Sequence, residues 1–197
     1  PYHNIAKVGP GEIVTVDLKT MNLSRKNLWQ DYQIRSKKFD LKVFREKTIS
    51  SIQKVAKNKQ KTGIFLSGGL DSTFALSVVK DMNIDLTAYI LEYDESKGSI
   101  NDQDGFREES RMAVKTCKEW GVPYKLVQLH QLEVGHLGKS WIANTHYTWV
   151  DRNRQAPRYK LCQAASRDGC KVILTGDSAD ELYTGYMHHH KRFEPGY

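Results

Sequence analysis

The segment from Ser67 to Ser72 carries residue types that bind phosphate groups. It reads Ser-Gly-Gly-Leu-Asp-Ser and follows the short apolar run 62–66. Gly68 and Gly69 let the backbone approach an anion closely, and successive N–H groups form a concave donor site. The helix expected after this loop would aim its N-terminal N–H groups at the same point, and the two serine hydroxyls add donors. We therefore expect a phosphate or pyrophosphate at this loop.

Asp71 is unusual in an anion site, because its carboxylate would repel a phosphate. A divalent cation such as Mg²⁺, bridging Asp71 to phosphate oxygens, resolves the conflict. The alternative is an ordinary strand–turn–helix with a glycine-rich turn, which Ser-Gly-Gly alone would not exclude. The longer pattern SGGxDS favours the anion site. The loop is neither GxxxxGK[ST], since no Lys follows the glycines, nor GxGxxG.

A second polar segment follows the apolar run 171–174. From Thr175 it reads Thr-Gly-Asp-Ser-Ala-Asp-Glu-Leu-Tyr-Thr-Gly-Tyr, with acids at Asp177, Asp180 and Glu181. Taken alone, these acids fit a helix N-terminus, where the helix dipole favours negative charge. The presence of the first loop favours a functional site instead.

Apolar runs alternate with helical patterns along most of the chain. The sequence predicts strands over 62–66, 86–91, 124–129 and 171–174, and helices over 41–57, 74–79, 106–120 and 156–167. This alternation predicts an α/β fold of three layers, with a parallel sheet covered by helices on both faces. Both polar segments follow strands and would open at the same sheet edge, so Asp71 and Asp180 are expected to share one Mg²⁺.

The first forty residues have a different character. The segment 10–18 begins with Pro-Gly and continues with alternating apolar residues, which predicts a turn and a half-buried strand. Residues 19–40 are polar, basic and dotted with aromatics, which suggests a linker. We therefore divide the chain into residues 1–40 and residues 41–197.

Composition excludes several classes of protein. The 197 residues carry 30 Lys and Arg against 23 Asp and Glu, a net charge of +7 that suits a nucleotide and does not by itself exclude RNA. No run approaches the ~20 apolar residues of a membrane helix, and no secretory signal opens the chain. Cys117, Cys162 and Cys170 form no CxxC pair, so we expect buried thiols in a reducing compartment, by default the cytoplasm.

The two polar segments together resemble a known family. The first resembles the pyrophosphate loop of the ATP pyrophosphatase superfamily. The second is similar to the second signature of asparagine synthetases and β-lactam synthetases, and the residues 10–17, Pro-Gly-Glu-Ile-Val-Thr-Val-Asp, resemble the end of their glutaminase domain. The resemblance covers nearly the whole chain, and it implies an adenine nucleotide alpha hydrolase-like, Rossmann-like fold.

The resemblance also implies roles for individual residues. Asp71 and Asp180 would hold Mg²⁺, while Asp177, Asp180 and Glu181 would be the catalytic acids. The ATP-binding set would be Leu66, Ser67, Gly68, Gly69, Asp71, Ser72, Leu91, Thr175 and Gly176.

The implied reaction is asparagine synthesis. ATP would adenylate the side-chain carboxylate of aspartate, and ammonia would then displace AMP. A separate glutaminase subunit or domain and a homo-oligomer are left open as partners. Binding to a membrane or to nucleic acid is not expected.

The sequence departs from the family at three points. The glutaminase domain with its N-terminal Cys is absent, and so is the C-terminal helical region with its charge-stabilising Lys. Asp177 is also one methylene shorter than the usual Glu. We expect a fragment or a natural short form that binds ATP and turns over poorly. Two alternatives are a synthetase with another acyl substrate and a non-catalytic ATP-binding remnant. The second signature argues against a third, a tRNA-modifying relative.

Overall fold

The computed structural model describes residues 5–28, 38–57, 60–93, 106–130, 133–145, 152–183 and 185–186. The chain divides into two compact units, residues 1–44 and residues 45–197. The boundary between them falls inside helix α1 (Leu41–Ala56), a few residues after the division expected from the sequence.

The first unit contains a β-hairpin. Strand β1 (Glu12–Val16) pairs antiparallel with β2 (Leu23–Asn27), so that Val14 lies opposite Arg25. In the turn between the strands, the Asp17 carboxylate accepts hydrogen bonds from the backbone N–H groups of Lys19 and Thr20, at 2.8 and 3.2 Å. Assigning all of residues 19–40 to a linker was therefore wrong. Every residue of β2 is exposed, so the strand has no apolar alternation to reveal it. Residues 29–37 of that segment lie outside the described part of the chain.

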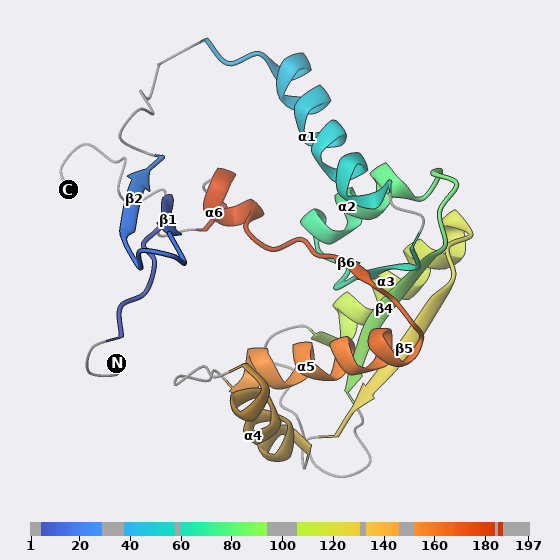
Figure 1. Ribbon diagram of the computed structural model, residues 1–197. Helices are drawn as coiled ribbons and strands as arrows, with labels where there is room; N and C mark the ends of the chain where they lie inside the picture. The colour runs from blue at the N-terminus through green and yellow to red at the C-terminus, as the bar shows by residue number, and fades with distance from the viewer. Residues whose placement is uncertain are drawn as a thin grey trace, which may run out of the picture. The chain divides into compact units, whose positions relative to one another are not determined.

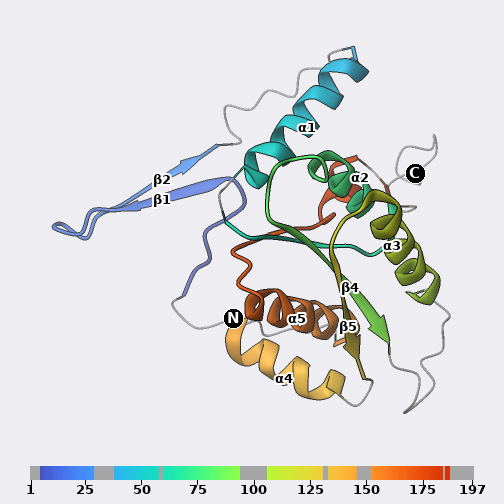
Figure 2. The same cartoon turned by 90° about the vertical axis from the view of Figure 1, so that its right-hand side faces the viewer.

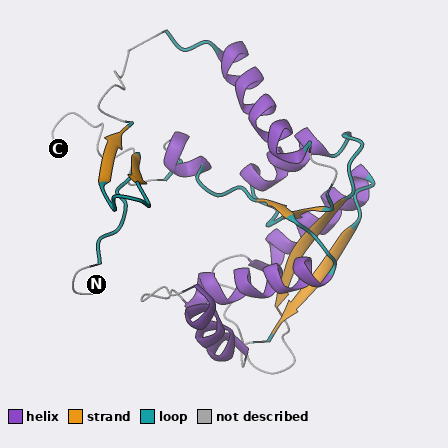
Figure 3. Ribbon diagram, viewed as in Figure 1, coloured by secondary structure: helices purple, strands orange, loops and turns teal. Residues whose placement is uncertain are grey.

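The second unit is built on one parallel sheet. Its strands are β3 (Thr62–Phe65), β4 (Leu86–Tyr93), β5 (Tyr124–Leu129) and β6 (Val172–Leu174), in the spatial order β5-β4-β3-β6. The four strands form the orange layer of this unit in Figure 3. The helices between and after them are α2 (Leu70–Val79), α3 (Phe106–Trp120), α4 (Val134–Thr145), α5 (Arg152–Arg167) and α6 (Ala179–Tyr183).

Alternation along β4 divides the core between the two faces of the sheet. Ala88 and Ile90 pack with buried residues of α2 and α3 and with Ala56 at the end of α1. Tyr89 points the other way and packs with Val127 and with Ala165 of α5. Figure 2 shows α2 and α3 on one side of the sheet and α5 on the other. The predicted three-layer α/β fold is therefore confirmed.

On the second face, α5 packs against β4 and β5, and α4 packs against α5 (Figure 1). They meet through the rings of Trp141 and Tyr159, whose centroids lie 6.2 Å apart with their planes at 87°. The sequence analysis did not identify α4, and it began α5 at Ala156 instead of Arg152. A proline commonly occupies the first position of a helix, but Pro157 here lies inside α5.

The cysteines correct another expectation. Cys117 is buried in the core, where burial raises the pKa of its thiol to about 11. Cys170 is half-buried, whereas Cys162 is exposed on α5, so the expected burial of all three was wrong.

Among the described residues, no helix combines the length and apolarity that crossing a membrane requires.

Candidate functional site

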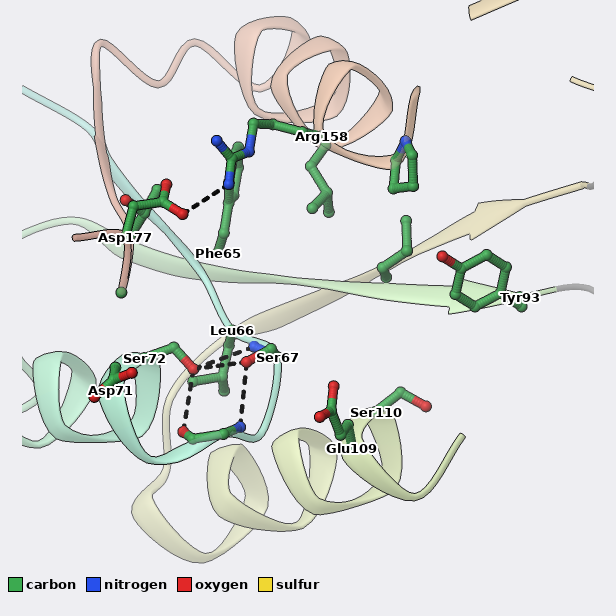
Figure 4. Close-up of a pocket in the computed structure, with 16 residues that line it drawn as sticks. Phe65, Leu66, Ser67, Asp71, Ser72, Tyr93, Glu109, Ser110, Arg158 and Asp177 are labelled. Carbon is green, nitrogen blue, oxygen red and sulfur yellow. Dashed lines mark hydrogen bonds and ion pairs between the residues drawn. The ribbon is translucent and has the colours of Figure 1, made fainter. Parts of the chain in front are cut away.

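A pocket of about 490 Å³ lies in the second unit, beyond the carboxyl ends of β3 and β6 and along the end of β4. Figure 4 shows the side chains that surround it. Nine lining residues belong to the predicted site: Leu66, Ser67, Gly69, Asp71, Ser72, Leu91, Thr175, Gly176 and Asp177. The two polar segments therefore meet in one cavity, as expected for loops at one edge of a parallel sheet.

The first loop is held by its own serines. Ser72 Oγ accepts a hydrogen bond from the Ser67 backbone N–H at 3.3 Å and lies 3.1 Å from Ser67 Oγ. Ser72 Oγ also donates to the Gly69 carbonyl, and the Gly69 N–H donates to Ser67 Oγ. No side chain caps α2 at Gly69, so the first N–H groups of that helix are not used by a cap. This end of the pocket has the donors that an anion needs.

Gly68 does not line the pocket. It lies on the side of the loop that packs against α3. Its φ is +90°, in the left-handed region that favours glycine. A β-carbon at this position would lie 2.2 Å from the Glu109 carbonyl oxygen. The first turn of α3 therefore packs directly against the loop, and only glycine fits there.

The second segment packs closely on the first. A β-carbon on Gly176 would lie 2.9 Å from the Ser72 backbone nitrogen and 3.0 Å from Asp71 Cβ. The Asp71 pKa is raised above its usual range, first by burial and then by the charge of the Asp180 carboxylate. The two acids predicted to share a metal ion therefore lie near enough to repel each other.

Asp180 and Glu181 belong to α6 and do not line the pocket itself. The Asp180 backbone carbonyl accepts a hydrogen bond from the Gly185 N–H at 3.0 Å. The Glu181 carboxylate accepts one from the Tyr186 hydroxyl, also at 3.0 Å. Among the described residues, no group of three or more His, Cys, Asp or Glu side chains is arranged to hold a metal ion. A cation here would need ligands besides Asp71 and Asp180.

The sequence analysis missed several residues of the pocket. The most consequential is Arg158 of α5, whose Nη2 lies 2.7 Å from Asp177 Oδ1 in an ion pair (Figure 4). Glu109 at the start of α3 also lines the cavity, and burial raises its pKa. Sequence spacing gave no signal for Arg158, because an arginine on a helix is usually a solvated surface residue and its partner Asp177 is 19 positions away in the sequence. The other lining residues that were missed are Phe65, Tyr93, Ser110, Pro157 and Leu161.

Curated relatives match most of this chain but only part of their own length. The chain is 24% identical to the amidase chyE of Penicillium rubens over 161 residues, 79% of this chain and 24% of that protein. It is also 24% identical to the amidase chry2 of Gibberella zeae over 159 residues, 72% of this chain and 22% of that protein. The chain therefore spans about a quarter of the length of these relatives.

A solved structure supports the fold. The structure of NMN synthetase from Francisella tularensis superposes with a TM-score of 0.50 at 19% identity, covering 76% of this chain and 59% of that one. At this identity the likeness concerns the fold alone.

A family model covers most of the chain. The model described as asparagine synthase matches residues 44–195, which include the glycine-rich loop, the pocket and the acidic segment that follows β6. The chain belongs to the asparagine synthase family.

Proposed function

We propose that this chain is the ATP-binding part of an amide-forming ligase that releases AMP and pyrophosphate. A carboxylate oxygen of the acyl substrate attacks the α-phosphorus of ATP, and pyrophosphate leaves. An amine nitrogen then attacks the acyl carbon, loses a proton and displaces AMP. For the finer reaction we propose aspartate as the acid and ammonia as the amine.

The observation that supports this function is the packing of two loops from paired strands around one pocket. The loop after β3 offers backbone and serine donors at an uncapped helix N-terminus, which suits phosphate oxygens. The loop after β6 closes over it through Gly176 and brings Asp177 into the same cavity. Leu66 and Leu91 provide an apolar surface in the pocket against which the adenosine portion of the nucleotide would pack.

Asp71 and Asp180 fit a divalent cation such as Mg²⁺. Burial, and then repulsion from the Asp180 carboxylate, raises the Asp71 pKa, and a cation held by the two acids would remove that repulsion. Phosphate oxygens would supply further ligands. When bound, Mg²⁺ would neutralise charge on the phosphates. Asp71 and Asp180 would hold the ion beside the glycine-rich loop.

The roles of the remaining acids follow from their positions. Asp177 lines the pocket and is proposed to contact the acyl substrate. The Glu181 carboxylate accepts a hydrogen bond from Tyr186, which lies just after α6, and Glu181 is proposed to stabilise this helix, which carries Asp180. The location in the cytoplasm and a glutaminase partner remain predictions.

A pyrophosphate-exchange assay tests this function. The chain is incubated with labelled pyrophosphate, Mg·ATP and single carboxylic acids, and label entering ATP is counted. Exchange that depends on aspartate supports the proposal, whereas exchange with another acid only would replace the substrate. Product analysis that finds ADP and phosphate in place of AMP and pyrophosphate would contradict the reaction type.

Amide hydrolysis is the second candidate, because both curated relatives are named amidases. The hydroxyls of Ser67 and Ser72 lie in the pocket, but they bond to each other and to the loop backbone. Incubating the chain with asparagine distinguishes the candidates. Ammonia release that needs no nucleotide would favour an amidase.

A further inference from the structure

The pocket has a second charged end besides the glycine-rich loop. There Arg158 of α5 and Asp177 of the loop after β6 form an ion pair of 2.7 Å, with side chains 46% and 49% exposed. Figure 4 shows Arg158 reaching from its helix toward Asp177, on the other side of the cavity from Ser67 and Ser72. Opposite charges at this exposure contribute little stability, so the pair is not explained by folding alone.

Arg158 is the one cationic side chain among the described residues that line the pocket. Three carboxylates line it as well, those of Asp71, Glu109 and Asp177. An acidic ligand entering this cavity therefore meets mostly negative charge. Any carboxylate that it places away from the glycine-rich loop has Arg158 as its available counter-ion within the described lining.

Within the described residues, the ion pair with Asp177 uses one of the guanidinium's N–H groups. A single nitrogen, Nη2, bonds to a single oxygen of Asp177. A guanidinium offers five N–H donors in a planar fork that matches a carboxylate. Arg158 can thus accept a ligand carboxylate while it stays near Asp177, and Asp177 retains an oxygen for a ligand cation.

We propose that Arg158 and Asp177 together recognise the zwitterionic head group of an α-amino acid. Arg158 binds the α-carboxylate and Asp177 binds the α-ammonium group. The pair screens its own charges when the pocket holds no amino acid. The side-chain carboxylate of the ligand then remains for activation. This inference rests on the proposed function and assigns the two residues that would distinguish an amino acid with free α-amino and α-carboxyl groups from other carboxylic acids.

Calorimetric titrations test the assignment group by group. The chain is saturated with Mg²⁺ and α,β-methylene ATP, which cannot be cleaved at the reacting bond, and is titrated with three acids. Aspartate carries both head-group charges, isoasparagine lacks the α-carboxylate charge, and succinate lacks the ammonium group. The same titrations without nucleotide separate amino acid binding from nucleotide binding.

Arg158→Gln should weaken aspartate binding about 10- to 100-fold, the effect of losing hydrogen bonds to a charged group. It should leave isoasparagine binding within about twofold of wild type. Asp177→Asn should weaken aspartate and leave succinate unchanged. Arg158→Lys should recover part of the aspartate affinity. Arg167→Gln, an exposed arginine on the same helix, is the matched control and should change nothing.

Three results would overturn the assignment. One is wild-type binding that does not distinguish aspartate from isoasparagine. Another is an equal loss for all three acids in Arg158→Gln. The third is a loss of nucleotide affinity in that variant with the acid preferences retained. Failure of the wild-type chain to bind the ATP analogue would instead contradict the proposed function, and the titrations without nucleotide would still test Arg158.

Discussion

Gly176 lies directly against the backbone of Ser72. A β-carbon on Gly176 would be 2.9 Å from the Ser72 nitrogen, closer than unbonded atoms of this kind approach. The contact joins the loop after β6 to the first turn of α2, although these segments are far apart in the sequence. The absence of a side chain at Gly176 therefore allows the loop after β6 to pack against the glycine-rich loop.

Gly176→Ala should separate the two loops. We expect a loss of Mg·ATP affinity of at least about tenfold, because displacing donor groups by a few tenths of an ångström weakens each hydrogen bond. The unfolding free energy should fall by about 1–3 kcal/mol, the usual cost of overpacking. Calorimetry and urea denaturation measure the two effects. Gly135→Ala is the control for the clash, because a β-carbon there meets nothing within 4 Å, and its one expected effect is a small gain in the stability of α4.

Asp71→Asn should stabilise the fold while it impairs ligand binding. Burial and Asp180 raise the Asp71 pKa, so its ionised form is disfavoured in the folded chain. Removing the charge at neutral pH should raise the unfolding free energy by at most about 1 kcal/mol, since the helix N-terminus offsets part of the repulsion. Mg·ATP affinity should fall in the same variant. Equal Mg·ATP affinity in variant and wild type would contradict the metal role.

The pH dependence of that stabilisation has a definite sign. The folded state keeps the Asp71 proton to a higher pH than the unfolded state, whose value is near 3.8. Wild-type stability therefore falls as pH rises from about that value through the folded pKa. The difference between Asp71→Asn and wild type should be present at pH 7 and vanish below that range. Thermal melting across pH measures it, with Asp85→Asn, an exposed acid, as the control.

Gly68→Ala tests the contact between the loop and α3. Gly68 and Gly169 both have positive φ, +90° and +82°, but a β-carbon on Gly169 meets nothing within 4 Å. Gly169→Ala should therefore show only backbone strain, roughly 1–2 kcal/mol. Gly68→Ala adds a clash with the Glu109 carbonyl and should destabilise the chain clearly more and reduce Mg·ATP binding. Equal destabilisation in urea would show that α3 does not restrain the loop.

Tyr89 anchors the side of the sheet that faces α5. Its buried hydroxyl donates to Asp168 at 2.9 Å, and Lys125 pairs with the same carboxylate. Tyr89→Phe should lower Tm by roughly 2–4 °C, the shift that about 1 kcal/mol gives in a chain of this size. Tyr124→Phe, which loses no side-chain hydrogen bond to the described part of the chain, is the control. No difference between the two variants in thermal melting would contradict the anchoring role.

Asp168 should make stability depend on acid in the opposite direction to Asp71. Hydrogen bonds from Lys125 and then from Tyr89 lower its pKa below the usual 3.8. Its contribution is therefore complete above that value and is lost as pH falls through the folded pKa. Asp168→Asn should melt below wild type at pH 7, and the gap should close on acidification. A gap that persists below pH 2 would assign the effect to packing.

The strands of the parallel sheet could be predicted because buried strands consist largely of apolar residues. Strands β3 to β6 are short apolar runs, and α3 carries a clear amphipathic pattern. Hairpin strand β2 could not be predicted, because backbone pairing holds it while all its side chains remain exposed. Helix α4 contains two glycines, which weaken helix propensity, and it is supported by packing on α5.

The part of the candidate site that could be predicted is the part whose residues are close together in the sequence. The glycines and serines of the first loop lie together in the sequence, and the placement of Ser67 and Ser72 follows from the strand before them. Arg158 could not be predicted, because its place depends on where α5 begins and how it rotates on the sheet. The predicted helix 156–167 already contained Arg158, but without a known packing face it did not show which way that side chain points.

The order β5-β4-β3-β6 has a consequence for how the protein is made. Thr62 pairs with Val172 on one side of β3. That side stays unpaired until β6, the last of the described strands of the sheet, has been synthesised. Such pairings raise contact order and slow folding. A nascent chain that has not released β6 from the ribosome lacks Thr175, Gly176 and Asp177, and with them one wall of the pocket. A nucleotide bound at this pocket would therefore assist folding of this unit only after β6 and the loop that follows it have emerged.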